Sequence, residues 1–258
     1  MRHLYEDYPE HIASIIRHMQ RDRDSPQPAA EDVMDAELDR VWMGDSKPHV
    51  AGYFRARIFP KPGATERLEL HYRQPMRKRT VPITDSRFKV STPVPDMLYG
   101  YDEEAAYPEL RRQLIDMGNE MDADNSHYSL IYPFFVVEFV GDGDGLWAAT
   151  NKCLGGSAAC VNILEKLKRR LRRCGRNAAQ VNSTAFSVVR NGSEVRLFVS
   201  WKHERDYYMA TAKAFVIGDA EHWIELRKYV RNIIDWGETT RLEQIRNALN
   251  ALIEDSRE

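Results

Sequence analysis

An apolar run that breaks into a glycine- and aspartate-rich turn constrains this chain more than any other stretch. Residues 132–145 read Tyr-Pro-Phe-Phe-Val-Val-Glu-Phe-Val-Gly-Asp-Gly-Asp-Gly. The part from 134 to 140 is too short for a typical helix and is rich in aromatic and β-branched side chains, which predicts a buried central strand. Glu138 is its only charge. Because an unpaired buried carboxylate is costly, we expect Glu138 to be either a paired structural charge or a functional acid.

The composition is that of one folded core with extensions. Of the 258 residues, 43% are hydrophobic, which is enough to bury a full core. The 37 basic and 39 acidic residues nearly cancel, so a polyanionic partner would have to meet a local basic patch. The three cysteines form no Cys-x-x-Cys pair, which argues against a disulfide framework and against a zinc site. A reducing compartment fits this cysteine usage.

We expect neither a signal peptide nor a membrane-spanning segment from the sequence. The N-terminus lacks the apolar segment of a signal peptide, and no run approaches the length needed to cross a bilayer. We therefore expect an intracellular protein, in the cytoplasm or the nucleus, without a membrane partner. The oligomeric state is left open by the sequence.

The first 45 residues are expected to form a helical extension of a domain at 46–258. Apolar residues recur at helical spacing in two places in the extension, and a polar, proline-containing connector lies between them. Short runs of strand type follow. The expected elements are helices at 11–20 and 31–42, then strands at 51–59 and 67–72.

A second acid lies at the start of another predicted strand. Residues 90–101 read Val-Ser-Thr-Pro-Val-Pro-Asp-Met-Leu-Tyr-Gly-Tyr. The two prolines force an extended backbone up to Asp96, and the apolar residues after it predict a strand. Between this strand and the central one we expect a helix at 107–117 and a polar excursion at 118–129, which is placed to cover the site.

The remainder of the chain predicts a long helix, a hairpin with a third strand and two terminal helices. Gly175 is placed to cap the long helix, and Gly237 is placed to end the first terminal helix. Asn191-Gly192 between two β-rich runs specifies a type I′ hairpin. The expected elements are a helix from 146 to about 173, strands at 185–190, 194–201 and 207–217, and helices at 221–236 and 241–254.

Seven of the eleven residues from 166 to 176 are basic. They lie in the last turns of the long helix, where cations complement the helix dipole. A solvated helix face and a phosphate-binding ridge are therefore both open interpretations. The ridge interpretation makes nucleic acid the partner, and its candidate residues are Lys166, Lys168, Arg169, Arg170, Arg172 and Arg173.

Four stretches resemble a known family. They are Pro-Asp-Met-Leu-Tyr-Gly-Tyr at 95–101, Pro-Phe-Phe-Val-Val-Glu-Phe at 133–139, Ala-Thr-Asn-Lys-Cys-Leu-Gly-Gly-Ser-Ala at 149–158 and Phe-Val-Ser-Trp-Lys-His at 198–203. Their wording, and the order strand, strand, long helix and hairpin strand, resemble uncharacterised fungal proteins with a PD-(D/E)XK nuclease-like domain. The resemblance covers about residues 90 to 254. It implies an α/β (α+β) restriction-endonuclease-like fold, a mixed β-sheet core flanked by helices, that acts on DNA or RNA.

The resemblance also implies a metal site. Asp96 and Glu138 would bind Mg²⁺ or Mn²⁺, since one or two carboxylates leave places for water and the scissile phosphate. We expect the two carboxylates within about 4–7 Å of each other, so that they share one hydrated ion. By resemblance, the main-chain carbonyl of Phe139 is a further ligand. Asp142 and Asp144 are also acids near the site, although aspartate before a helix is an ordinary N-cap.

The motif of that family has a lysine two residues after the glutamate, on the same side of the strand, where it stabilises developing phosphate charge. This sequence has Val140 there. Lys152, near the start of the long helix, is a candidate replacement. An early helix often adds a glutamate by resemblance, for which Glu37 is one candidate among several.

Two functions of different classes follow. The first is metal-dependent hydrolysis of nucleic acid by Asp96, Glu138 and Lys152, or a weakened remnant of it, because losing one preorganised charge costs on the order of 10²–10³ in rate. The second, motivated by Val140, is a catalytically inactive nuclease-fold module that binds nucleic acid or protein.

Overall fold

The computed structural model describes residues 8–23, 36–43, 46–63, 67–83, 91–124, 130–140, 145–191 and 193–255. They form a mixed α+β fold around one six-stranded sheet in the order β1-β2-β3-β4-β5-β6. Its strands are β1 (Leu68–His71), β2 (Met97–Asp102), β3 (Leu130–Phe139), β4 (Ala185–Arg190), β5 (Glu194–His203) and β6 (Asp206–Val216). Neighbouring strands are antiparallel except β3 and β4, which are parallel and joined through a long helix. The α+β class expected from the sequence is confirmed.

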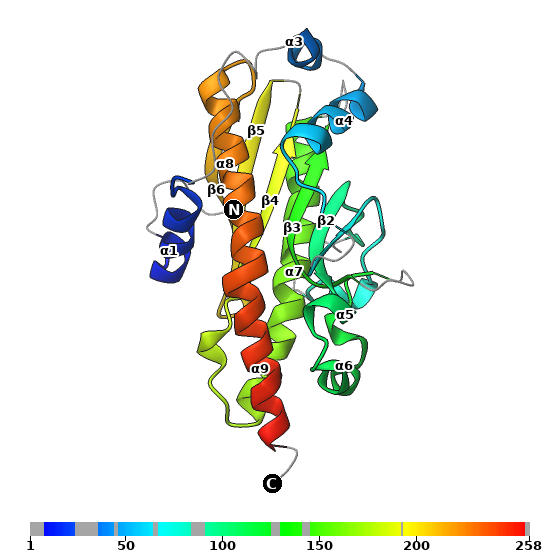
Figure 1. Ribbon diagram of the computed structural model, residues 1–258, viewed down its shortest axis with the longest axis vertical. Helices are drawn as coiled ribbons and strands as arrows, with labels where there is room; N and C mark the ends of the chain where they lie inside the picture. Colours follow the sequence, from blue (N-terminus) through cyan, green and yellow to red (C-terminus); the bar gives the residue numbers. More distant parts are fainter. Residues whose placement is uncertain are drawn as a thin grey trace.

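Helices cover both faces of this sheet (Figure 1). The α-helices are α1 (Glu10–Met19), α3 (Ala36–Trp42), α4 (Lys47–Arg57), α5 (Glu103–Ala106), α6 (Arg111–Met117), α7 (Leu146–Arg173), α8 (Ala220–Trp236) and α9 (Leu242–Asp255). Short 3₁₀ turns lie at Lys78–Thr80, Gly118–Met121 and Ala178–Gln180, and a π-helical turn lies at Gly237–Arg241. The N-terminal helix α1 packs on the domain, because the Asn232 side chain donates to the carbonyl of Met19.

The two faces of β3 can be assigned from its neighbours. Val136 lies against α7, where a Cβ added to Gly156 would be 3.1 Å from the valine side chain. Phe135 and Phe139 point to the other face and contact Phe59 near the end of α4. Because successive strand residues alternate between faces, Glu138 points to the α7 face, as Val136 does.

All ten residues of β3 are buried, which confirms the predicted central strand. Burial on both faces explains why this strand is a continuous apolar run without an alternating polar face. Helix α7 also has the predicted extent, and Gly175 follows it with φ +66°, as expected of a C-terminal capping glycine. Strands β4 and β5 form the predicted hairpin. The predicted type I′ turn depends on Gly192, which lies outside the described residues.

The strand predicted at 51–59 is wrong, because this segment is helix α4. Its buried side chains include Val50, Tyr53 and Phe54, which recur at helical spacing. Pro48 lies in the first turn, where a missing N–H costs nothing. Apolar and basic residues alternate from 54 to 58, which is typical of a strand, whereas the buried residues of α4 follow helical spacing.

Helix α8 ends at Trp236 as expected, but the expected role of Gly237 as the residue that caps it is wrong. Gly237 has helical angles, φ −60° and ψ −46°, and the chain continues through the π-helical turn into α9. Figure 1 shows α8 and α9 as one nearly continuous rod. A Cβ on Gly237 would lie 2.3 Å from Cζ of Phe134, and the Tyr101 hydroxyl donates to the Gly237 carbonyl at 2.6 Å. The glycine therefore permits close packing of this turn on β3.

Gly237→Ala is expected to lower the free energy of unfolding by about 1–3 kcal/mol, because the new methyl group overlaps the Phe134 ring. Gly52→Ala in α4 is the matched control. Its added Cβ meets nothing within 4 Å, so alanine there should stabilise the helix by roughly 0.5–1 kcal/mol. Urea unfolding of both variants measures the difference; equal stabilities would contradict the packing argument.

Candidate functional site

Asp96 and Glu138 are cross-strand neighbours. Met97 pairs with Val137 in the antiparallel β2–β3 ladder, and one more step of this register places Asp96 opposite Glu138. Such a pair shares one face of the sheet. Both residues are buried, with exposed fractions of 5% and 3%, and their carboxyl groups are hydrogen-bonded to each other. The structure therefore brings the two predicted acids together on the α7 face.

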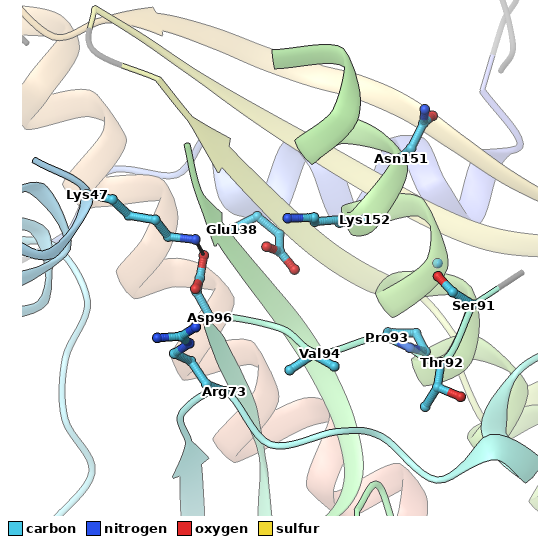
Figure 2. Close-up of a pocket in the computed structure, with 11 residues that line it drawn as sticks. Lys47, Arg73, Ser91, Thr92, Pro93, Val94, Asp96, Glu138, Asn151 and Lys152 are labelled. Atoms are coloured by element: carbon cyan, nitrogen blue, oxygen red, sulfur yellow. Dashed lines mark ion pairs between the residues drawn. The ribbon is translucent and has the colours of Figure 1, made fainter. Parts of the chain in front are cut away.

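The acid pair opens into a cavity of about 310 Å³ (Figure 2). The extended segment 91–96 forms one wall, and the first turns of α7 form the other. Three basic side chains line it: Lys47 from the start of α4, Arg73 after β1 and Lys152 from α7. Its other lining residues are Ser91, Thr92, Pro93, Val94, Asn151 and Gly155. Two acids thus share one cavity with three cations.

Asp96 is held by two contacts on the same carboxylate oxygen. Its Oδ2 accepts the main-chain N–H of Phe139 at 2.9 Å, and the ammonium of Lys47 lies 2.7 Å from the same atom. Figure 2 shows Lys47 reaching this carboxylate from α4. These contacts orient Asp96 toward Glu138 and compensate its negative charge in a buried position.

Burial, and after it the neighbouring Asp96, raises the pKa of Glu138 from its ordinary value of 4.5 to about 8. Lys152 and Lys47 oppose this shift by favouring the charged form. At neutral pH, the metal-free chain therefore keeps a proton on Glu138, which can donate it in the hydrogen bond to Asp96.

This shift predicts how stability depends on pH. Between about pH 4.5 and 8 the folded chain holds a proton on Glu138 that the unfolded chain has lost. The free energy of unfolding should therefore fall as the pH rises through this window. Glu138→Gln mimics the protonated acid, so in urea unfolding with EDTA it should match wild type near pH 5 and exceed it near pH 8. Identical pH slopes for the two proteins would show that Glu138 titrates normally.

Val140 occupies the position at which the motif has a lysine. Val140 is buried on the same face as Glu138. It belongs to an apolar cluster that also contains Ala149, Cys153, Val189, Phe198 and Met209. In contrast, Lys152 lines the cavity from α7, and Figure 2 shows its ammonium group directed toward Glu138. Cys153, the next residue, points inward, which turns Lys152 toward the cavity.

The other predicted site residues lie in different environments. The Phe139 side chain is buried on the opposite face, so only its main chain reaches the acid pair. Glu37 is ion-paired with Arg57 at 3.2 Å and does not line the cavity. Asp142 and Asp144 lie outside the described residues. Within the described ranges, no group of three His, Cys, Asp or Glu side chains is arranged to hold a metal ion.

The basic end of α7 does not adjoin the cavity. Lys166 follows Lys152 by fourteen residues, or about 21 Å along the helix. Several of its cations are engaged within the chain: Lys166 donates to the Arg79 carbonyl, Lys168 pairs with Glu165, and Arg170 donates to the Asp116 carbonyl. The side chains of Arg169, Arg172 and Arg173 are exposed, and Arg172 also pairs with Glu165 at 3.8 Å. The polar excursion at 118–129 is expected to cover the site. In its described part, however, Asp122 forms an ion pair with Arg77, and neither residue lines the cavity.

Sequence reasoning did not find Lys47 and Arg73. Lys47 precedes Pro48 at the start of a helix that was expected to be a strand. Arg73 begins a basic stretch at 73–79, shortly after β1. The backbone of Arg73 is left-handed, with φ +50°, and its N–H donates to the Pro95 carbonyl at 3.0 Å. This contact links the end of β1 to the segment that carries Asp96.

Within the described ranges, no helix has both the length and the apolar character required to cross a membrane.

Comparisons with known proteins place the chain in a family. No curated protein and no solved structure matches the chain. Residues 43–249 match a family described as "Domain of unknown function (DUF7924)", and this range contains every residue that lines the cavity. The match spans most of the chain, which therefore belongs to the DUF7924 family.

Proposed function

We propose that this protein hydrolyses phosphodiester bonds of nucleic acid with the help of Mg²⁺ or Mn²⁺. The observation that carries the proposal is the pair Asp96 and Glu138, buried opposite each other in a cavity with three basic side chains. The order of elements supports the restriction-endonuclease-like fold implied by the resemblance: the strand with Asp96, the strand with Glu138, the long helix and the hairpin strand follow one another.

The residues of the cavity suit a divalent cation. Two carboxyl groups in contact cannot both ionise easily, and a cation between them removes this repulsion. Asp96 and Glu138 would hold the ion, with the Phe139 carbonyl as a further ligand by resemblance. Bound there, the ion would supply Lewis-acid chemistry, which activates water and neutralises charge on the scissile phosphate.

The basic side chains supply the remaining functions. Lys152 faces the acid pair from α7, so its ammonium group is placed to stabilise negative charge that develops on the phosphate. Arg73 lines the same cavity and can hold a phosphate oxygen of the substrate. Lys47 keeps Asp96 oriented through their ion pair. Lys152 thereby takes over, from a helix, the task that the motif lysine performs from the strand.

One observation favours the alternative of a catalytically inactive module that binds nucleic acid or protein. Oδ2 of Asp96 already accepts the Phe139 N–H and pairs with Lys47, and Glu138 shares a hydrogen bond with Asp96. The acid pair is thus compensated within the chain and can persist without a metal ion.

Cleavage assays separate the two functions. The protein is incubated with end-labelled single-stranded and double-stranded DNA and RNA, in Mg²⁺, in Mn²⁺ or in EDTA. Metal-dependent cleavage of at least one substrate, absent in EDTA, is expected. Asp96→Asn, purified in parallel, controls for contaminating nucleases and should be inactive. If no substrate is cleaved with either metal, and neither metal raises the melting temperature of the protein, the protein is a catalytically inactive binding module.

A further inference from the structure

Trp147 is an exposed aromatic side chain at the start of α7. It is the second residue of α7, the helix that forms one cavity wall, and 79% of it is exposed. Three of the other four tryptophans, Trp201, Trp223 and Trp236, are at most 4% exposed. An indole buries a large apolar area when it is packed, so leaving one in water forgoes substantial stabilisation.

Helical spacing aligns Trp147 with the cavity wall. Trp147, Asn151 and Leu154 are separated by four and three residues and therefore form one stripe along α7. Asn151 lines the cavity together with Lys152. Leu154 is 38% exposed. On the facing wall, the cavity-lining Val94 is 48% exposed. Exposed apolar side chains thus lie on both segments that form the cavity walls.

Cationic side chains close to an exposed aromatic ring suit one class of ligand. Lys47, Arg73 and Lys152 provide positive charge inside the cavity, and Trp147 provides a flat ring about one helical turn before the cavity-lining Asn151. Single-stranded nucleic acid is bound in this way, with the backbone in a basic groove and the bases stacked on aromatic side chains. A cavity of about 310 Å³ is near the lower limit of ligand pockets and is too small to enclose a duplex.

We propose that Trp147 stacks on a nucleobase and that the site binds single-stranded nucleic acid, or the unpaired end of a strand, in preference to intact duplex. The phosphate of the bound nucleotide lies among the cavity cations, and its neighbouring base lies on the Trp147 stripe. The inference rests on the proposed nucleic-acid substrate, and it does not require that the substrate be hydrolysed.

Binding measurements without cleavage test this inference. Fluorescence anisotropy in EDTA measures the affinity for a labelled single strand of about 12 nucleotides, a usual site size, and for the matching duplex. Trp147→Ala should weaken single-strand binding by about 5- to 150-fold, the usual range for one stacked base, and should leave weak duplex binding unchanged. Trp147→Phe should keep most of the affinity. Trp42→Ala removes the other exposed tryptophan, which does not line the cavity, and should bind like wild type.

Intrinsic fluorescence gives an independent readout. In Trp42→Phe, Trp147 is the exposed indole and the other three are buried, so quenching by an unlabelled single strand reports on Trp147. Unchanged single-strand affinity in Trp147→Ala, or an equal loss for single strand and duplex, overturns the inference. Trp147-dependent binding without any cleavage supports it and refutes only the hydrolysis. Cleavage that is insensitive to Trp147→Ala overturns the stacking role and leaves the hydrolysis intact.

Discussion

Lys152→Ala is expected to lower the metal-dependent cleavage rate by about 10²–10³, because one preorganised charge near the reacting group typically contributes this factor. Lys152 lines the cavity, and its ammonium group is directed toward Glu138. The charge matters to the reaction more than to substrate affinity, so the loss should be in kcat with a smaller change in KM. Single-turnover cleavage at saturating substrate measures it.

Two variants control this experiment. Lys152→Arg keeps the positive charge on a slightly longer side chain and should retain more of the rate than Lys152→Ala. Lys213→Ala removes a lysine of β6 that pairs with Glu225 at 3.2 Å and does not line the cavity, so it should cleave like wild type. If Lys152→Ala cleaves at the wild-type rate, Lys152 does not replace the motif lysine, and the charge must come from Lys47 or Arg73.

Val140→Lys is expected to lower the free energy of unfolding by about 3–5 kcal/mol, the usual cost of an uncompensated buried charge. From the sequence motif alone, a lysine at 140 would be expected to restore activity, since it lies on the same side of the strand as Glu138. The structure changes this expectation, because Val140 packs in the apolar cluster beneath the first turns of α7. Urea unfolding measures the loss, and cleavage should not increase.

Val140→Met is the matched control for this substitution. Methionine has an unbranched side chain like that of lysine but carries no charge, so overpacking alone should cost it about 1–3 kcal/mol. The difference between the two variants then reports the cost of the charge. A Val140→Lys protein that is as stable as wild type and cleaves 10²-fold faster would show that the site lacks only its motif lysine.

Membership in DUF7924 identifies relatives without assigning a reaction, so the chemistry has to be argued from the cavity. The two functions predict different responses to the same metal ion. A hydrolase needs the ion between Asp96 and Glu138, whereas the inactive module already balances these acids with Lys47 and the Phe139 N–H. The cleavage and melting experiments therefore both depend on whether Asp96 and Glu138 bind a metal ion.

Local sequence patterns determined many of the secondary-structure elements of this protein. The apolar run of β3, the helical periodicity of α7 with its capping Gly175, and the two strands around Asn191 are each specified by neighbouring residues. These elements are recognisable because one period of hydrophobicity dominates each of them. The two prolines before Asp96 and the single acid at Glu138 also identified both members of the acid pair.

The tertiary structure decided which cations join that pair and which apolar residues remain exposed. Lys47 is 49 positions from Asp96 in the chain, and no local pattern records that α4 delivers it there. Position 237 requires a glycine because Phe134, distant in sequence, leaves no room for a side chain. Trp147 is exposed although an apolar residue in a helix is usually expected in the core. Local periodicity reports which face of an element is apolar, whereas contacts between distant segments determine what finally covers that face.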